Sequence, residues 1–162
     1  MKMKTGMFEV TAPEVLTPET LVNSHYKADK QNKMLSGESF AMPQGLALEG
    51  LGEPAWIGPI SAERYKKAEV VACYSNRGSE DYALEFPAGK RLATIPTDTV
   101  VDTKNLKYKS HWSVSGHSVS VHRELTAHFD EPLCRGTQRT EILAAVEKIR
   151  TDAKSKISLV AE

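Results

Sequence analysis

The stretch from Leu106 to Phe129 reads LKYKSHWSVSGHSVSVHRELTAHF, and it decides the fold. On both sides of Ser115-Gly116, apolar or aromatic residues recur at alternate positions. On the first side they are Leu106, Tyr108, Trp112 and Val114, and on the second Val119, Val121, Leu125, Ala127 and Phe129. A period of two predicts strands with one buried face, joined here as an antiparallel hairpin.

The parity of the connecting loop fixes which side chains face each other. An even-length loop at or around Ser115-Gly116 pairs Trp112 with Val119 and Leu106 with Leu125. It also sets Lys107 opposite Glu124, a charge pair that contributes about 0.2–1 kcal/mol. A three-residue loop would oppose lysines and histidines to the valines, so we predict an even loop.

Further elements are expected on both sides of this hairpin. Alternation over 67–75 and in Tyr82, Leu84 and Phe86 predicts more strands. A helix is predicted over 138–154 with Thr137 as its N-cap, and 157–160 would form a short last strand. The apolar stripe of the helix consists of Ile142, Leu143, Val146, Ile149 and Ala153.

Before residue 67 the sequence is harder to interpret. Pro13 and Pro18 predict an irregular arm over 1–20, and 21–42 is predicted to form a hairpin. Residues 43–60 are predicted to form an apolar loop, rich in glycine and proline, that packs on the core. We therefore expect one domain over 21–162: mainly β, an antiparallel sandwich-like fold with one C-terminal amphipathic helix.

The composition argues against some classes of function. Lys plus Arg equals Asp plus Glu, at 21 each among 162 residues, so the basic excess of a nucleic-acid binder is missing. No apolar run reaches the roughly 18 residues of a membrane span. The start, MKMKTG, lacks the apolar stretch of a signal peptide. A cytoplasmic location follows if Met1 is the true start, and an exported one if the chain is a piece of a longer protein.

The two cysteines offer little for catalysis. Cys73, His111 and Asp130 occur in the order of some thiol enzymes, but Cys73 lies within a predicted strand rather than at a helix N-terminus. No histidine follows Cys134. We predict no enzyme, with a small thiol enzyme using Cys73 as the remote alternative. A Cys73–Cys134 disulfide would close a loop of about 60 residues and contribute roughly 4 kcal/mol. The sequence leaves both this bond and two free thiols open.

No cofactor and no metal site are predicted. In the register above, His111 and His122 would be diagonal neighbours on the wet face, and no CxxC or helical HxxxH occurs. We interpret them as solvated strand histidines. Trp112 and Tyr108 alternate with apolar residues and are expected in the core. A peptide- or glycan-binding surface, if present, would use Trp56, Tyr74 and Tyr82.

The order of features resembles one known family. It runs from Arg64 through YALEFPAGKR (82–91) and Ile95-Pro96 to YKSHWSVSG (108–116) and VSVHREL (119–125), then the helix and Ile157-Ser158-Leu159. Over about residues 43–160 the chain resembles the C-terminal β-domain of bacterial exported transglutaminase-like proteins. In that family an N-terminal domain of unknown function and a transglutaminase-like core precede this domain.

The resemblance implies a non-catalytic accessory or interaction domain. The family's catalytic residues belong to the core, and no position here matches them. The resemblance implies a periplasmic setting, which would favour the disulfide, and as a partner a transglutaminase-like core or another protein domain.

Overall fold

A computed structural model describes residues 5–10, 22–27, 39–41, 67–73, 75–86 and 88–162. The chain divides into two compact units, residues 1–37 and 38–162, and each is described by itself.

The first unit contains an antiparallel pair of strands. β1 (Thr5–Val10) pairs with β2 (Val22–Lys27), from Thr5 opposite Lys27 to Val10 opposite Val22. The predicted irregular arm over 1–20 thus contains a strand. Pro13 and Pro18 follow β1 in the sequence, so neither interrupts its ladder.

The division of the chain also differs from the prediction. The boundary falls after residue 37, not after residue 20. The predicted hairpin over 21–42 is wrong, because β2 pairs with β1, the strand that precedes it in the sequence. Its expected return strand contains β3 (Ser39–Ala41), which pairs with β11 (Lys156–Ala161) at the other end of the chain.

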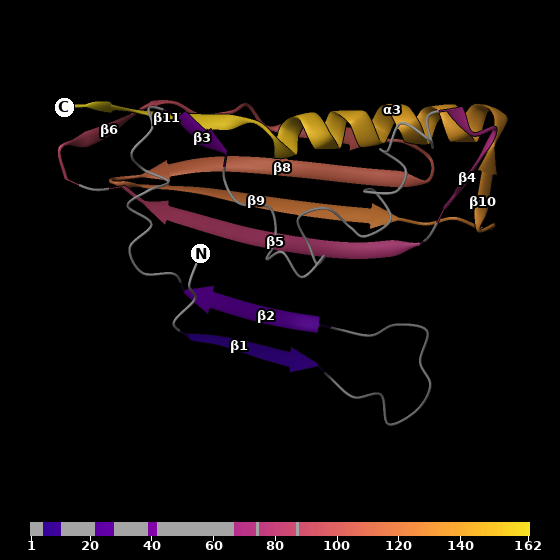
Figure 1. Cartoon of the computed structure of the whole chain (residues 1–162), viewed down its shortest axis with the longest axis horizontal. Coiled ribbons are helices and arrows are strands. Elements are labelled where there is room, and N and C mark those ends of the chain that lie inside the picture. Colours follow the sequence, from indigo (N-terminus) through magenta and orange to yellow (C-terminus); the bar gives the residue numbers. More distant parts are fainter. Residues whose placement is uncertain (1–4, 11–21, 28–38, 42–66, 74, 87) are drawn as a thin grey trace. The chain divides into compact units, whose positions relative to one another are not determined.

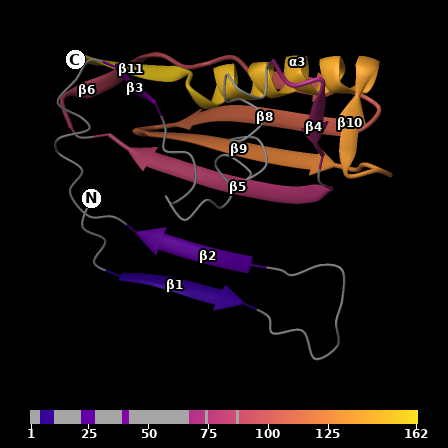
Figure 2. The same cartoon turned by 45° about the vertical axis from the view of Figure 1, so that its right-hand side comes forward.

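A four-stranded antiparallel sheet forms the centre of the second unit. Its strand order is β5-β9-β8-β7, with β5 at Asn76–Glu85, β9 at Ser118–Ala127, β8 at Leu106–Ser115 and β7 at Thr99–Asp102. The long strands β5, β9 and β8 lie side by side in both Figure 1 and Figure 2.

The β8–β9 hairpin has the predicted even loop, but the pairing is shifted by two residues. Ser115 pairs with Ser118 across a turn of Gly116 and His117, and Gly116 takes a φ of 56°. Trp112 therefore faces Val121 rather than Val119. A shift of two keeps every side chain on its predicted face.

The same shift changes the expected pairs on the wet face. Lys107 lies opposite Thr126, and Glu124 instead faces Lys109. His111 and His122, predicted to be diagonal, stand directly opposite each other.

One face of the sheet is buried against helix α3 (Gly136–Ala153). The helix contacts β4, β7, β8 and β10, and runs alongside β8 in Figure 2. Between them lies the apolar core, which includes Leu106, Tyr108, Leu125, Ile142, Val146 and Ile149. Along β8 and β9, buried and exposed residues alternate as predicted. Such alternation is typical of antiparallel strands with one face on the core.

The helix begins earlier than predicted. Arg135, not Thr137, is the N-cap, and it makes no side-chain capping bond. Gly136 has a φ of 50°, a left-handed conformation that glycine adopts without the clash of a side chain. Ile142, Val146, Ile149 and Ala153 of the predicted stripe are buried, and Leu143 is partly so.

Two small sheets complete the unit. β4 (Val70–Ala72) pairs with β10 (Leu133–Arg135), and β11 lies between β3 and β6 (Lys90–Thr94). The predicted last strand is thus present. All strand pairs in the described residues are antiparallel. The predicted fold class is confirmed: mainly β and antiparallel, with a C-terminal helix.

Candidate functional site

A polar row crosses the buried face of the sheet. Glu80 on β5 pairs with Arg123 on β9, Arg123 with Ser110 on β8, and Ser110 with Thr99 on β7. Glu80, Ser110 and Arg123 are 7%, 0% and 4% exposed. Burying charges is costly unless they are paired, so this row is where a specific role is expected.

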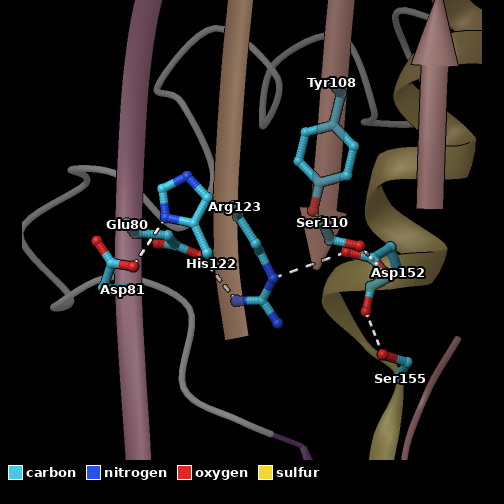
Figure 3. A network of polar contacts seen from close by, with 8 residues as sticks. All are labelled: Glu80, Asp81, Tyr108, Ser110, His122, Arg123, Asp152 and Ser155. Atoms are coloured by element: carbon cyan, nitrogen blue, oxygen red, sulfur yellow. Dashed lines mark hydrogen bonds and ion pairs between the residues drawn. The ribbon is translucent and has the colours of Figure 1, made fainter. Parts of the chain in front are cut away.

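Arg123 is the centre of the row, as Figure 3 shows. Its Nη1 donates to Glu80 Oε1 at 2.7 Å, and its Nε lies 3.7 Å from Oδ2 of Asp152 on α3. The guanidinium carbon sits 5.7 Å from the centre of the Trp112 ring, within cation–π range. One buried cation therefore serves two buried carboxylates.

Asp152 fastens the helix to the sheet. Tyr108 donates its hydroxyl to Oδ2 at 2.5 Å, and Ser110 donates to Oδ1 at 2.9 Å. Ser110 Oγ in turn accepts the N–H of Thr99 at 3.1 Å. Just after the helix, Ser155 donates its hydroxyl and its N–H to the Asp152 carbonyl oxygen. The carboxylate thus ties α3 to β8 directly and to β7 through Ser110.

The surroundings keep the nearby phenols neutral. Burial raises the pKa of Tyr108, and its hydrogen bond to Asp152 raises it further, because both favour the protonated hydroxyl. Burial also raises the pKa of Tyr82 to about 12, aided by the negative charge of Glu80. Both tyrosines therefore remain protonated throughout the physiological range.

The network is better suited to fastening than to catalysis. Ser110 and Tyr108 both donate to Asp152, and no histidine of β8 or β9 lies on this face to act as their base. Among the described residues, Arg123 Nη2 and Trp112 Nε1 are buried without a hydrogen-bond acceptor.

Sequence reasoning missed this row, although its signal was present. Arg123 has the same odd parity as Val119, Val121 and Leu125, so alternation places it among them. Glu80 likewise shares parity with Tyr82 and Leu84. A charged residue in step with an apolar face is a mark of a buried ion pair. Asp152 carried no such signal, because it lies at the edge of the helical stripe.

A shallow groove lies beside the helix. It has a volume of about 600 Å³ and runs between Pro96, Thr97 and Thr99 on one side and Lys148 and Thr151 on the other. Asp152 lines it as well, yet both its oxygens already accept hydrogen bonds.

The two cysteines form a disulfide. The sulfurs are 2.04 Å apart, and the residues are 2% and 0% exposed. Cys134 lies on β10 opposite Val71, while Cys73 directly follows β4 and extends the ladder by donating its N–H to the Pro132 carbonyl at 2.8 Å. The bond is part of the apolar core beneath α3.

The aromatic residues predicted to bind ligand are only partly located. Trp56 and Tyr74 lie outside the described residues. Tyr82 is half-buried on the inner face of β5. Trp112 and Tyr108, expected in the core, are 5% and 6% exposed.

The described residues show neither a cluster of metal ligands nor a membrane-spanning helix. No three or more His, Cys, Asp or Glu side chains among them gather to hold a metal ion. Within the same part of the chain, no helix has the length and apolarity to cross a membrane.

Comparison with known proteins shows a similarity of fold to one solved structure, described below. No protein-family model matches the chain. No curated protein matches it either. Among solved structures, it is similar to the crystal structure of a protein from Parabacteroides distasonis described as a putative protease, with a TM-score of 0.57 and 16% identity. The match covers 76% of this chain and 23% of that one, so the chain spans about a quarter of its neighbour's length. At this identity the likeness concerns the fold alone.

Proposed function

We propose that residues 38–162 form a non-catalytic accessory domain that docks another domain of a larger exported protein. The observation that carries the proposal is the Cys73–Cys134 disulfide in the core, because it leaves neither sulfur as a thiolate nucleophile. Among the described residues, the buried ionisable groups Tyr108, Arg123 and Asp152 link α3 to the sheet, and Glu80 pairs with Arg123 on the neighbouring strand. These groups therefore support a structural role.

The proposed setting is a longer protein. The fold occurs in a solved structure as about a quarter of the chain, which is what an accessory domain would look like. A disulfide favours an oxidising compartment such as the periplasm. We propose a transglutaminase-like core as the partner, on the strength of the sequence resemblance.

Two assays test this proposal together. The purified, oxidised chain is incubated with a protein substrate for hydrolysis and with an amine donor for transglutamination, in parallel with the Asp152→Asn variant. We expect no turnover from either protein. Turnover by the wild type that disappears in Asp152→Asn or in a Cys73→Ser/Cys134→Ser variant would overturn the non-catalytic role, provided that far-UV circular dichroism shows the variants folded.

Binding of peptide or glycan is a second candidate, favoured by strand β5. Among the described residues, this ten-residue strand pairs with β9 alone. Every second residue of such an edge strand directs its N–H and C=O away from the sheet, where an extended peptide can add as a further strand. Titration with peptidoglycan fragments should then shift the amide NMR signals of β5. Unshifted β5 signals at millimolar fragment would contradict this candidate.

A further inference from the structure

The outer edge of β5 carries a row of outward-directed backbone groups. β5 lies at one edge of the central sheet, on the side of β9 away from β8 (Figure 1). Directly beyond it, Phe86 donates its N–H to the His117 carbonyl oxygen at 3.0 Å and so continues the ladder with β9. N–H and C=O groups alternate in direction along an antiparallel strand, so the even-numbered residues of β5 bond to β9. The outward groups belong to the odd-numbered residues Arg77, Ser79, Asp81, Ala83 and Glu85.

This edge is open in the part of the chain that the structure describes. No hydrogen bond there engages the N–H groups of the odd-numbered residues, and all of these residues are exposed. The strand contains no proline and pairs with β9 in an unbroken register. Proteins usually shorten, bulge or interrupt an edge strand that must stay single. Its inward-facing charge, Glu80, is neutralised by Arg123 at 2.7 Å. β5 therefore remains able to accept a further strand.

The outer face of this edge is charged. Arg77, Asp81 and Glu85 recur at every fourth residue and therefore point to the same side of the strand. The Asp81 side chain is 80% exposed, and its Oδ1 lies 2.8 Å from His122 Nδ1. A carboxylate accepts through two oxygens, so this contact leaves Oδ2 for a second donor. An added strand would thus meet two carboxylates and one guanidinium on this face.

The inner face of the same edge is apolar and incompletely covered. Tyr82 and Leu84 on β5 are only half-buried. The contacts of α3 lie on β4, β7, β8 and β10, away from this edge. Apolar side chains of an added strand would remove further apolar area from water here.

We propose that β5 binds an extended segment of a partner protein in which two basic residues stand four positions apart, with apolar residues between them. In the antiparallel arrangement, the more stable one per residue, the first basic residue faces Glu85 and the second faces Asp81. An acidic residue four positions further along faces Arg77. The apolar residues face Leu84 and Tyr82, because directly opposed residues lie on the same face. The inference rests on the second candidate function, peptide addition to β5, and names the class of peptide.

The test is an NMR titration of the ¹⁵N-labelled full chain with two synthetic peptides. The matched peptide is acetyl-Lys-Val-Thr-Val-Lys-Thr-Thr-Val-Glu-amide, and its control exchanges each Lys for Glu and the Glu for Lys. The chain has a net charge of zero, so neither peptide has a general electrostatic advantage. We expect the matched peptide to bind about tenfold more tightly, by a margin that shrinks at high salt. The amide signals of the odd-numbered residues of β5 should shift more than those of the even-numbered ones.

Substitutions at Ala83 separate the backbone contribution from that of the side chains. Ala83→Pro removes one outward N–H and leaves the β5–β9 ladder whole, because Ala83 directs its N–H away from β9. It should weaken binding about tenfold or more, whereas Ala83→Val, which keeps the N–H, should bind as the wild type does. Glu85→Lys should weaken binding of the matched peptide and strengthen that of the control. Circular dichroism confirms that each variant is folded.

The possible contrary results have different consequences. β5 amides unshifted by either peptide at millimolar concentration would overturn the inference together with peptide addition itself. Equal affinity for both peptides, lost in Ala83→Pro, would overturn the charge preference and leave peptide addition standing. Concentration-dependent shifts of the β5 amides without any peptide would place a second copy of the chain on this edge and would also overturn the inference.

Discussion

Replacement of Arg123 by methionine tests the buried row most sharply. Methionine keeps the unbranched apolar stem but removes the guanidinium that serves Glu80 and Asp152. The carboxylate side chains are then left 6% and 1% exposed without their cation. Removing one member of a buried ion pair costs about 3–5 kcal/mol, because an uncompensated charge remains. Asp152 keeps its donors Tyr108 and Ser110, which limits the part of this loss that arises there.

The loss should depend on pH with a definite sign. Without Arg123, burial disfavours the charged form of the Glu80 carboxylate in the folded state, whereas a carboxyl group of the unfolded chain ionises near pH 4.3. Stability linked to such a group is fully present below the unfolded pKa and is lost as pH rises through the folded pKa. The deficit of Arg123→Met relative to wild type should therefore be largest at pH 7.5 and shrink at pH 4.5.

Urea denaturation followed by circular dichroism at both pH values measures this effect. Arg77→Met is the control, because Arg77 is exposed on β5 and its loss should change stability by less than about 0.5 kcal/mol. The double variant Glu80→Gln/Arg123→Met should be more stable than Arg123→Met alone at pH 7.5, since one buried charge is gone. A loss below about 1 kcal/mol, or one equal at both pH values, would refute the reasoning.

Three further predictions concern the same core. Tyr108→Phe removes a buried donor to Asp152 and should cost about 1.5–3 kcal/mol in the free energy of unfolding; an unchanged urea midpoint would contradict the bond. Val146→Asp places an unpaired charge at a position 1% exposed and should cost more than about 4 kcal/mol, whereas Ala144→Asp on the exposed side of α3 should be tolerated; equal losses would refute the helix orientation. Ultraviolet titration should show a tyrosine with a pKa of about 12 that is missing in Tyr82→Phe. Stability linked to Tyr82 should be present below pH 10 and lost as pH rises through 12; ionisation near pH 10 would contradict its burial.

Much of the second unit was predictable because alternation is a local signal. The parity of Leu106, Tyr108 and Trp112 was enough to assign the faces of β8, and the even loop followed from matching the faces of β9. The exact register of β8 and β9 was not predictable. Two even loops whose centres differ by one residue place the same side chains on the buried face. The two-residue shift that results brings His111 opposite His122.

The rest depends on contacts between distant segments. β3 pairs with β11 across more than a hundred residues of chain, and β2 pairs with β1 instead of with the downstream strand that was expected. Neither pairing has a local signature. Asp152 is a similar case, since its role depends on Tyr108 and Ser110, which reach it from another element.

The covalent link in the core is the observation on which the non-catalytic proposal depends. Its direct test is the intact mass of the chain, exported to the periplasm of the expression host, purified without reductant, and treated with iodoacetamide in denaturant. We predict no adduct before reduction and two after it, because Cys73 and Cys134 are joined. Two adducts on the unreduced chain would show free thiols and contradict the account.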